Sequence, residues 1–197
     1  KLRRSQEKAV AARPYSSRLE EMLSSLASSA ASGEGIIKLL TGTGNDQNYI
    51  VVPVSADRGL CGGFNSSINR ETFKLVKSLE NDGKNVQLMP VGKKSRDFFN
   101  RVMKEQIVES FIDLNVSNNG YDSALNVSNK LQDLYFEGKF DKCILVFNKF
   151  KSAISQEVTQ QQLIPLDVSE SSTESKEDNN DAKAIYDYEP DEETILK

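Results

Sequence analysis

Histidine is absent from this chain of 197 residues. Its absence excludes Ser-His-Asp and Cys-His catalysis and any metal site that needs an imidazole ligand. Cysteine is scarce, and Cys61 and Cys143 alone are too few for a zinc site without histidine. Cys61 follows the end of one expected strand and Cys143 begins another, so a parallel sheet would place them at opposite edges. We therefore expect two reduced thiols.

Long apolar runs are also missing. No run approaches the roughly 18–20 residues that a membrane-spanning helix requires, and no signal-peptide pattern is present. The chain begins at Lys1 rather than at methionine, so we expect the natural N-terminus to be missing. The length suits one core with an appendage.

Charge is distributed unevenly, although the formal net charge is only −4. Residues 1–18 carry six basic side chains against Glu7, whereas residues 167–193 carry eleven acidic side chains against two lysines. A basic first segment could suggest nucleic acid, but the rest of the chain lacks the basic and aromatic face expected there. An acidic protein partner fits better, and we expect no nucleic-acid partner.

Residues 48–65 combine a strand, a glycine-rich loop and the start of a helix. The apolar, β-branched run 49–54 is typical of a buried strand. Helical spacing begins at Phe64, with Asn65 as a plausible N-cap. The glycines of the loop suit a tight turn, and we expect Gly62 or Gly63 to adopt a positive φ.

The loop Asp57–Gly63 also raises the possibility of nucleotide binding. A Walker-type loop needs a lysine and a hydroxyl after its last glycine, but phenylalanine and asparagine stand there. The glycine spacing does not match the dinucleotide fingerprint either. A small α/β nucleotide- or phosphate-binding protein that uses this loop remains the alternative function.

Hydrophobic periodicity predicts an α/β fold with a Rossmann-like, doubly wound layer. We expect strands at 49–54, 86–91, 107–114 and 143–147, helices at 65–81, 93–104 and 121–136, and an exposed extended strand at 154–166. Residues 33–47 should form a linker, residues 48–166 the α/β domain and residues 167–190 an acidic mobile loop.

The first 32 residues are predicted to form one long helix, since no glycine precedes Gly33. Its apolar residues step by four, three and four positions, which is typical of a coiled-coil seam. The seam consists of Tyr15, Leu19, Met22 and Leu26. Because it covers one stripe, the helix needs a partner helix; packing across its own domain is the alternative.

Residues 55–65, S-A-D-R-G-L-C-G-G-F-N, are similar to the S-D-R-G-L-C-G-G-F-N signature of the gamma subunit of the rotary F-type ATP synthase, with Ala56 as an insertion or substitution. Further matches follow in family order: K-L-R-R-S-Q-E at 1–7, A-R-P-Y at 12–15, G-K-K at 92–94 with F-F at 98–99, F-N-K-F at 147–150 and L-I-P-L at 163–166. The resemblance covers nearly the whole chain.

This resemblance implies a non-catalytic central-stalk rotor subunit, which couples ion flow through a membrane rotor ring to ATP synthesis in a ring of alpha and beta subunits. It implies that residues 1–32 are half of an antiparallel coiled coil and that residues 191–197 begin a truncated C-terminal helix. An epsilon-type subunit and the membrane rotor ring would be further partners. The location would be peripheral, on the cytoplasmic face of a bacterial inner membrane or the matrix face in mitochondria, with no catalytic residue, cofactor or metal.

Candidate subunit-interface residues follow from the same resemblance. The basic residues Lys1, Arg3 and Arg4 would face the stator ring, and Arg58 would lie where the axle meets the ring. The seam residues Tyr15, Leu19, Met22 and Leu26 would face the partner helix. A solvated surface charge is the alternative for each basic residue.

Overall fold

A computed structural model describes residues 37–114, 116–152 and 155–166, together with residues 10, 11, 14, 15, 18, 19 and 22. The long first helix, the acidic loop 167–190 and the C-terminal segment 191–197 therefore fall largely or wholly outside the described residues. Residues 10, 11, 14, 15, 18, 19 and 22 are helical. No described helix is long and apolar enough to cross a membrane.

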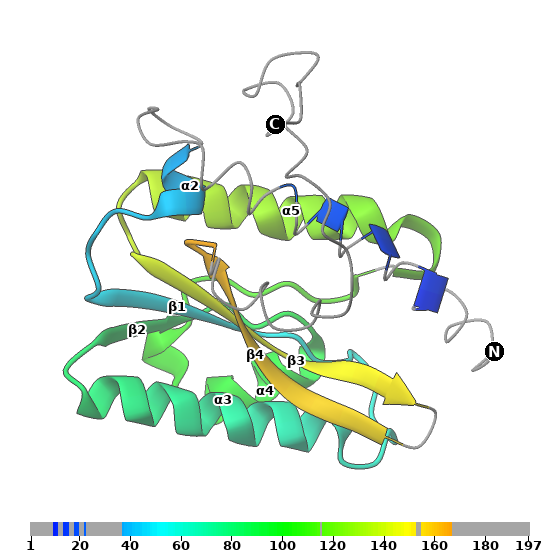
Figure 1. Ribbon diagram of the computed structural model, residues 1–197. Coiled ribbons are helices and arrows are strands. Elements are labelled where there is room, and N and C mark those ends of the chain that lie inside the picture. Colours follow the sequence, from blue (N-terminus) through cyan, green and yellow to red (C-terminus); the bar gives the residue numbers. More distant parts are fainter. Residues whose placement is uncertain are drawn as a thin grey trace, which may run out of the picture.

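A four-stranded sheet in the order β2-β1-β3-β4 forms the centre of the fold (Figure 1). The central strand β1 (Asn48–Pro53) runs parallel to β2 (Asn85–Leu88) and to β3 (Lys142–Ser152). The edge strand β4 (Ser155–Ile164) pairs antiparallel with β3. After its first residue β1 is buried throughout, as the continuous apolar run predicts for a strand covered on both faces.

Helices cover both faces of this sheet (Figure 1). The helices α3 (Phe64–Asn81) and α4 (Lys93–Val102) lie on one face, and α5 (Val116–Phe136) lies on the other with the short α2 (Ile37–Thr41). A single turn of 3₁₀ helix (Lys104–Gln106) follows α4.

Two apolar clusters, one on each face, form the core. Val51 of β1 packs in one cluster with Ile68 of α3 and Phe99 of α4. Its neighbour Ile50 points to the opposite face and packs with Leu131 and Tyr135 of α5. Alternate residues of one strand thus reach both layers, and the predicted mixed α/β class is confirmed.

The third strand predicted at 107–114 is wrong. This segment makes only two isolated bridges beside β2, Leu88 with Ile107 and Val91 with Phe111. Pro90 lies between the two bridged residues and has no N–H to donate, so a continuous ladder cannot form there. The strand predicted at 143–147 is confirmed and extends to residue 152, and the extended segment 154–166 contains β4.

The predicted linker is not structureless, because α2 lies within it. The Tyr135 hydroxyl of α5 donates a hydrogen bond to the Lys38 carbonyl at 2.6 Å, which fixes α2 against α5. Only a long-range contact of this kind stabilises so short a helix.

Candidate functional site

The loop of residues 55–63 lies at the carboxyl end of β1 and leads into α3. The Asp57 carboxylate accepts a hydrogen bond from the backbone N–H of Lys93 at 2.8 Å. Lys93 is the first residue of α4, so Asp57 caps a helix that lies far along the chain. The backbone N–H of Lys94 also donates to the Ala56 carbonyl, at 3.2 Å. The loop is therefore attached to the first turn of α4.

Asn65 holds the same loop from the side of α3. Its Oδ1 accepts the backbone N–H of Ala56 at 2.9 Å, and its Nδ2 donates to the Arg58 carbonyl at 3.3 Å and to the Cys61 sulfur at 2.9 Å. The predicted N-cap role of Asn65 is wrong, because Gly63 occupies the cap position and no side chain caps the helix. The amide folds back over the loop, where three partners are within its reach.

The tip of the loop has an unusual backbone. Gly62 has φ 57°, which confirms the positive φ expected at Gly62 or Gly63, whereas Gly63 has φ −78°. Leu60 has φ 60°, a left-handed conformation that is unfavourable for a residue with a Cβ atom. Its side chain is fully exposed to solvent. An apolar side chain and a strained backbone thus coincide at the most exposed part of the loop.

The loop and the start of α4 approach so closely that only glycine fits at position 92. Gly92 has φ 97°, and a Cβ atom there would lie 2.2 Å from the Ser55 carbonyl oxygen. The Ser55 hydroxyl accepts the N–H of Ser95 at 2.9 Å, and the Ser95 hydroxyl donates to Asn69 Oδ1 at 2.6 Å. This largely buried network joins the loop, α4 and α3. Sequence reasoning missed it, since its members are 14 to 40 positions apart in the chain.

Two basic side chains lie at the loop, whereas its one acidic side chain is bonded to the start of α4. Arg58 is exposed. The Lys94 side chain lies beside Gly59, with its Cε 3.4 Å from where a Cβ atom of Gly59 would be. Asp57 is turned onto the positive end of α4, which favours a carboxylate. The outer surface of the loop therefore presents positive charge.

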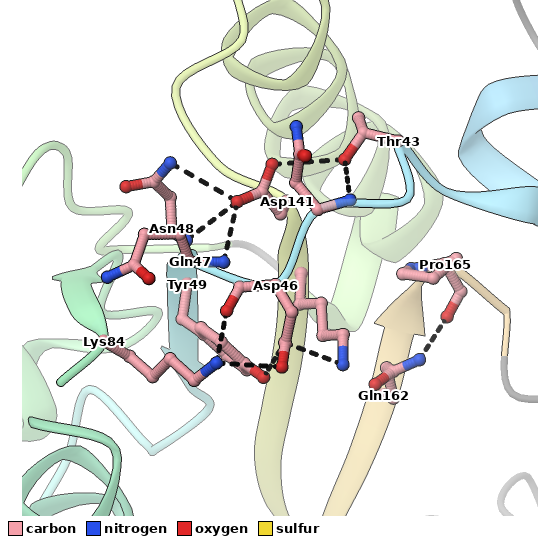
Figure 2. Close-up of polar contacts among 11 residues, drawn as sticks. Thr43, Asp46, Gln47, Asn48, Tyr49, Lys84, Asp141, Gln162 and Pro165 are labelled. Carbon is pink, nitrogen blue, oxygen red and sulfur yellow. Dashed lines mark hydrogen bonds and ion pairs between the residues drawn. The ribbon is translucent and has the colours of Figure 1, made fainter. Parts of the chain in front are cut away.

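A second polar cluster lies at the opposite, amino end of the parallel strands (Figure 2). Asp46 forms ion pairs with Lys84 and Lys142, both at 2.9 Å, and accepts a hydrogen bond from the Tyr49 hydroxyl. The hydrogen bond from Tyr49, followed by those from the two lysines, holds the pKa of Asp46 far below its ordinary value. These contacts tie the starts of three strands together, so the cluster is structural.

Comparison with known proteins identifies the family. A family model described as ATP synthase matches residues 1–197. The chain is 46% identical over 198 residues to an ATP synthase gamma chain from Rhodospirillum rubrum. The aligned region covers 100% of this chain and 66% of the relative. The corresponding protein of Paramagnetospirillum magneticum is 44% identical over 196 residues, with the same coverage. This chain belongs to the ATP synthase gamma-chain family.

A solved structure that resembles this chain agrees with the family assignment. The structure is a Tetrahymena thermophila mitochondrial ATP synthase, central stalk and c-ring. Its matching chain has a TM-score of 0.62 and 25% identity, over 84% of this chain and 67% of that one. This chain thus spans about two thirds of the length of the gamma-chain relatives that it matches.

The family match and the described geometry of loop 55–63 do not support the alternative of a nucleotide-binding loop. The amino end of α4 is the place where a phosphate could meet free N–H groups, but the Asp57 carboxylate already accepts the first of them. No group of three potential metal-ligating side chains occurs within residues 37–114, 116–152 and 155–166 or the few described near the N-terminus.

The candidate interface residues are only partly described. Arg58 is exposed at the loop. Tyr15 and Leu19 are 73% and 42% exposed, and Met22 is half-buried. Lys1, Arg3, Arg4 and Leu26 lie outside the described residues, and their interface role stays a prediction. Cys61 and Cys143 are both free thiols, as expected.

Proposed function

We propose that this chain acts as the central-stalk rotor subunit of an F-type ATP synthase and carries out no chemistry itself. The observation that supports the proposal best is the family match along all 197 residues. The likeness to a chain of a central-stalk structure, at a TM-score of 0.62, agrees with it. In this role the subunit transmits rotation between a membrane rotor ring and the alpha and beta subunits that make ATP.

Loop 55–63 is the part of the α/β domain that we propose as a contact with the alpha and beta ring. Arg58 supplies an exposed positive charge, and Leu60 supplies an apolar side chain that has no cover in this domain. Exposed apolar and basic side chains on a fixed loop are typical of a protein interface. Lys1, Arg3 and Arg4 would face the same ring.

The first 32 residues are proposed as half of an antiparallel coiled coil. The exposed seam residues Tyr15 and Leu19 favour a helix as the partner. An epsilon-type subunit and the membrane rotor ring are proposed to bind the α/β domain. The resulting complex would lie peripherally on the cytoplasmic face of a bacterial inner membrane, as the bacterial relatives favour, or on the matrix face in mitochondria.

Isolation of the tagged full-length protein from its own cells tests this function. We expect alpha and beta subunits to co-purify with it in a fixed ratio. The purified chain alone should hydrolyse no ATP, and ATP should give no thermal shift; a bound ligand at 100 times its Kd would stabilise the fold by about 2.7 kcal/mol. ATP turnover by the isolated chain that is lost in Arg58→Ala would contradict the proposal.

A further inference from the structure

Loop 55–63 is held from two sides by side chains that the family assignment gives no role. Asp57 joins it to α4 through the N–H of Lys93, and Asn65 joins it to α3 through three hydrogen bonds. We propose that Asp57 and Asn65 are positioning residues, which fix one conformation of the loop and thereby set where Arg58 meets the partner subunit. This inference rests on the proposed function, in which Arg58 is a contact.

The first argument comes from the backbone of the loop. Nine residues with three glycines would sample many conformations if nothing held them. Leu60 nevertheless keeps a left-handed φ of 60° with its side chain in solvent, so packing does not maintain that conformation. The hydrogen bonds of Asn65 to the Arg58 carbonyl and the Cys61 sulfur lie on either side of Leu60. Together with the contact of the Cys61 thiol with the Arg58 carbonyl at 3.9 Å, they hold the two sides of Leu60 in place.

The second argument concerns Arg58 itself. Asn65 Nδ2 donates directly to the Arg58 carbonyl, so the amide fixes the peptide from which the guanidinium projects. Asp57, the preceding residue, is anchored on α4 at 2.8 Å. Arg58 therefore projects from a peptide that is fastened on both sides. A side chain that transmits force between subunits needs such a rigid base, because a loose one would absorb the displacement.

The third argument is electrostatic. If the Asp57 side chain pointed outward, its charge would lie beside Arg58 and weaken the attraction of the loop for an acidic partner. The bond to Lys93 instead directs that carboxylate to the amino end of α4, where the helix dipole favours it. Gly92 permits this arrangement, since any Cβ atom there would collide with Ser55. One contact thus partly offsets the opposing charge and fixes the loop.

A double-mutant cycle in the assembled complex tests the inference. The full-length chain is incorporated into its own ATP synthase, and ion pumping per ATP hydrolysed is measured in vesicles. Asp57→Ala and Asn65→Ala should each lower this ratio at least about twofold, with Asp57→Asn, which keeps the acceptor, restoring most of it. Asp82→Ala and Asn81→Ala are matched controls, since both residues are exposed at the far end of α3; they should leave the ratio unchanged.

The decisive comparison uses Arg58→Ala as the background. If Asp57 and Asn65 act by positioning Arg58, adding either substitution to Arg58→Ala should cause no further loss. Hydrogen exchange of the loop and of the first turn of α4 should rise about fivefold or more in Asp57→Ala, while exchange in β1 stays the same. This pattern would separate a loosened loop from a destabilised domain.

Two outcomes would overturn the inference. Losses that add fully in the Arg58→Ala background would mean that the two residues act elsewhere, and an Arg58→Ala complex with normal coupling would mean that there is no contact to position. In both cases the alpha and beta subunits would still co-purify with the chain. Failure of the proposed function itself gives a different result, because those subunits would then be absent.

Discussion

The Asp141 carboxylate accepts the backbone N–H of Asn48 at 2.8 Å, a contact that joins the starts of β3 and β1 across 93 positions (Figure 2). The Asn48 carbonyl in turn accepts the N–H of Asp141 at 2.7 Å. The same carboxylate also accepts the N–H of Gln47 and the hydroxyl of Thr43, both at 3.1 Å. A single buried acid thus fixes the segment that leads into the central strand.

Replacing this acid should therefore destabilise the domain. Asp141→Ala leaves two backbone N–H groups without acceptors in a nearly buried place, so we expect a loss of about 2–4 kcal/mol in the free energy of unfolding. Asp141→Asn keeps one acceptor oxygen and should cost less than half as much. Urea denaturation of both variants measures this. Equal losses in the two would show that packing, not hydrogen bonding, is the role of Asp141.

The contribution of Asp141 should depend on pH in a defined direction. Burial raises the pKa of Asp141, but the hydrogen bonds from Asn48, Gln47 and Thr43 outweigh it, so the pKa is lowered. A lowered pKa gives stability that is present above the unfolded value of about 3.9 and is lost as pH falls through the folded value. The stability difference between the parent and Asp141→Asn should stay constant from about pH 5.5 to 8 and shrink below about pH 4. A difference that persists undiminished at pH 2.5 would refute the assignment.

Gly92 should be the least replaceable glycine of the described region. Alanine there meets the Ser55 carbonyl oxygen at 2.2 Å and must also adopt φ 97°. We expect Gly92→Ala to cost more than about 3 kcal/mol, the sum of a backbone penalty and overpacking. Gly83→Ala is the matched control, because Gly83 has φ 76° with no atom within 4 Å of the added Cβ, and it should cost about 1–2 kcal/mol. Similar melting temperatures for the two variants would contradict this account.

Local pattern was sufficient to predict β1, α3 and the mixed α/β class. The run of Ile50, Val51 and Val52 is apolar at every position, and each of these residues is fully buried. The prediction of a third strand at 107–114 failed for a reason that lies outside that segment's own sequence. Residues 107–114 alternate as a strand should, but a ladder also needs a continuous donor edge on the neighbour. Pro90 interrupts that edge, which becomes apparent only when the register is known.

The glycines in the sequence were sufficient to identify the candidate loop, but they did not predict its geometry. Asn65 is a residue type that favours the N-cap position, and no local rule shows that its amide folds back to Ala56. Asp57 caps a helix that begins 36 positions later. Only glycine fits at position 92 because a Cβ atom there would collide with the Ser55 carbonyl oxygen. Sequence patterns describe neighbours along the chain, whereas these contacts depend on how β1 and α4 pack together.

The two cysteines should differ sharply in reactivity. Cys61 is exposed on the loop, whereas Cys143 is fully buried in β3, where burial raises the pKa of its thiol to about 12. We expect a thiol reagent at pH 8 to modify one cysteine in the native protein and both after denaturation, since the thiolate is the reactive form. Cys61→Ser should abolish native labelling. Rapid native labelling of that variant would mean that β3 opens readily.

The seam of the first helix gives the last prediction. Tyr15 and Leu19 are 73% and 42% exposed, and burial of one leucine is worth about 1.5–3 kcal/mol, so the 197-residue chain gains free energy when another copy covers the seam. We expect self-association through residues 15–26, seen as a sedimentation coefficient that rises with protein concentration.

Leu19→Glu should abolish this association, because it places a charge in the contact between two seams. Val108→Glu alters an exposed apolar residue outside the seam and should leave the association unchanged. The alternative is a helix that packs across its own domain, in which case the seam needs no second copy. A monomer at every concentration, with residues 1–30 fully protected from hydrogen exchange, would establish that alternative and exclude self-association.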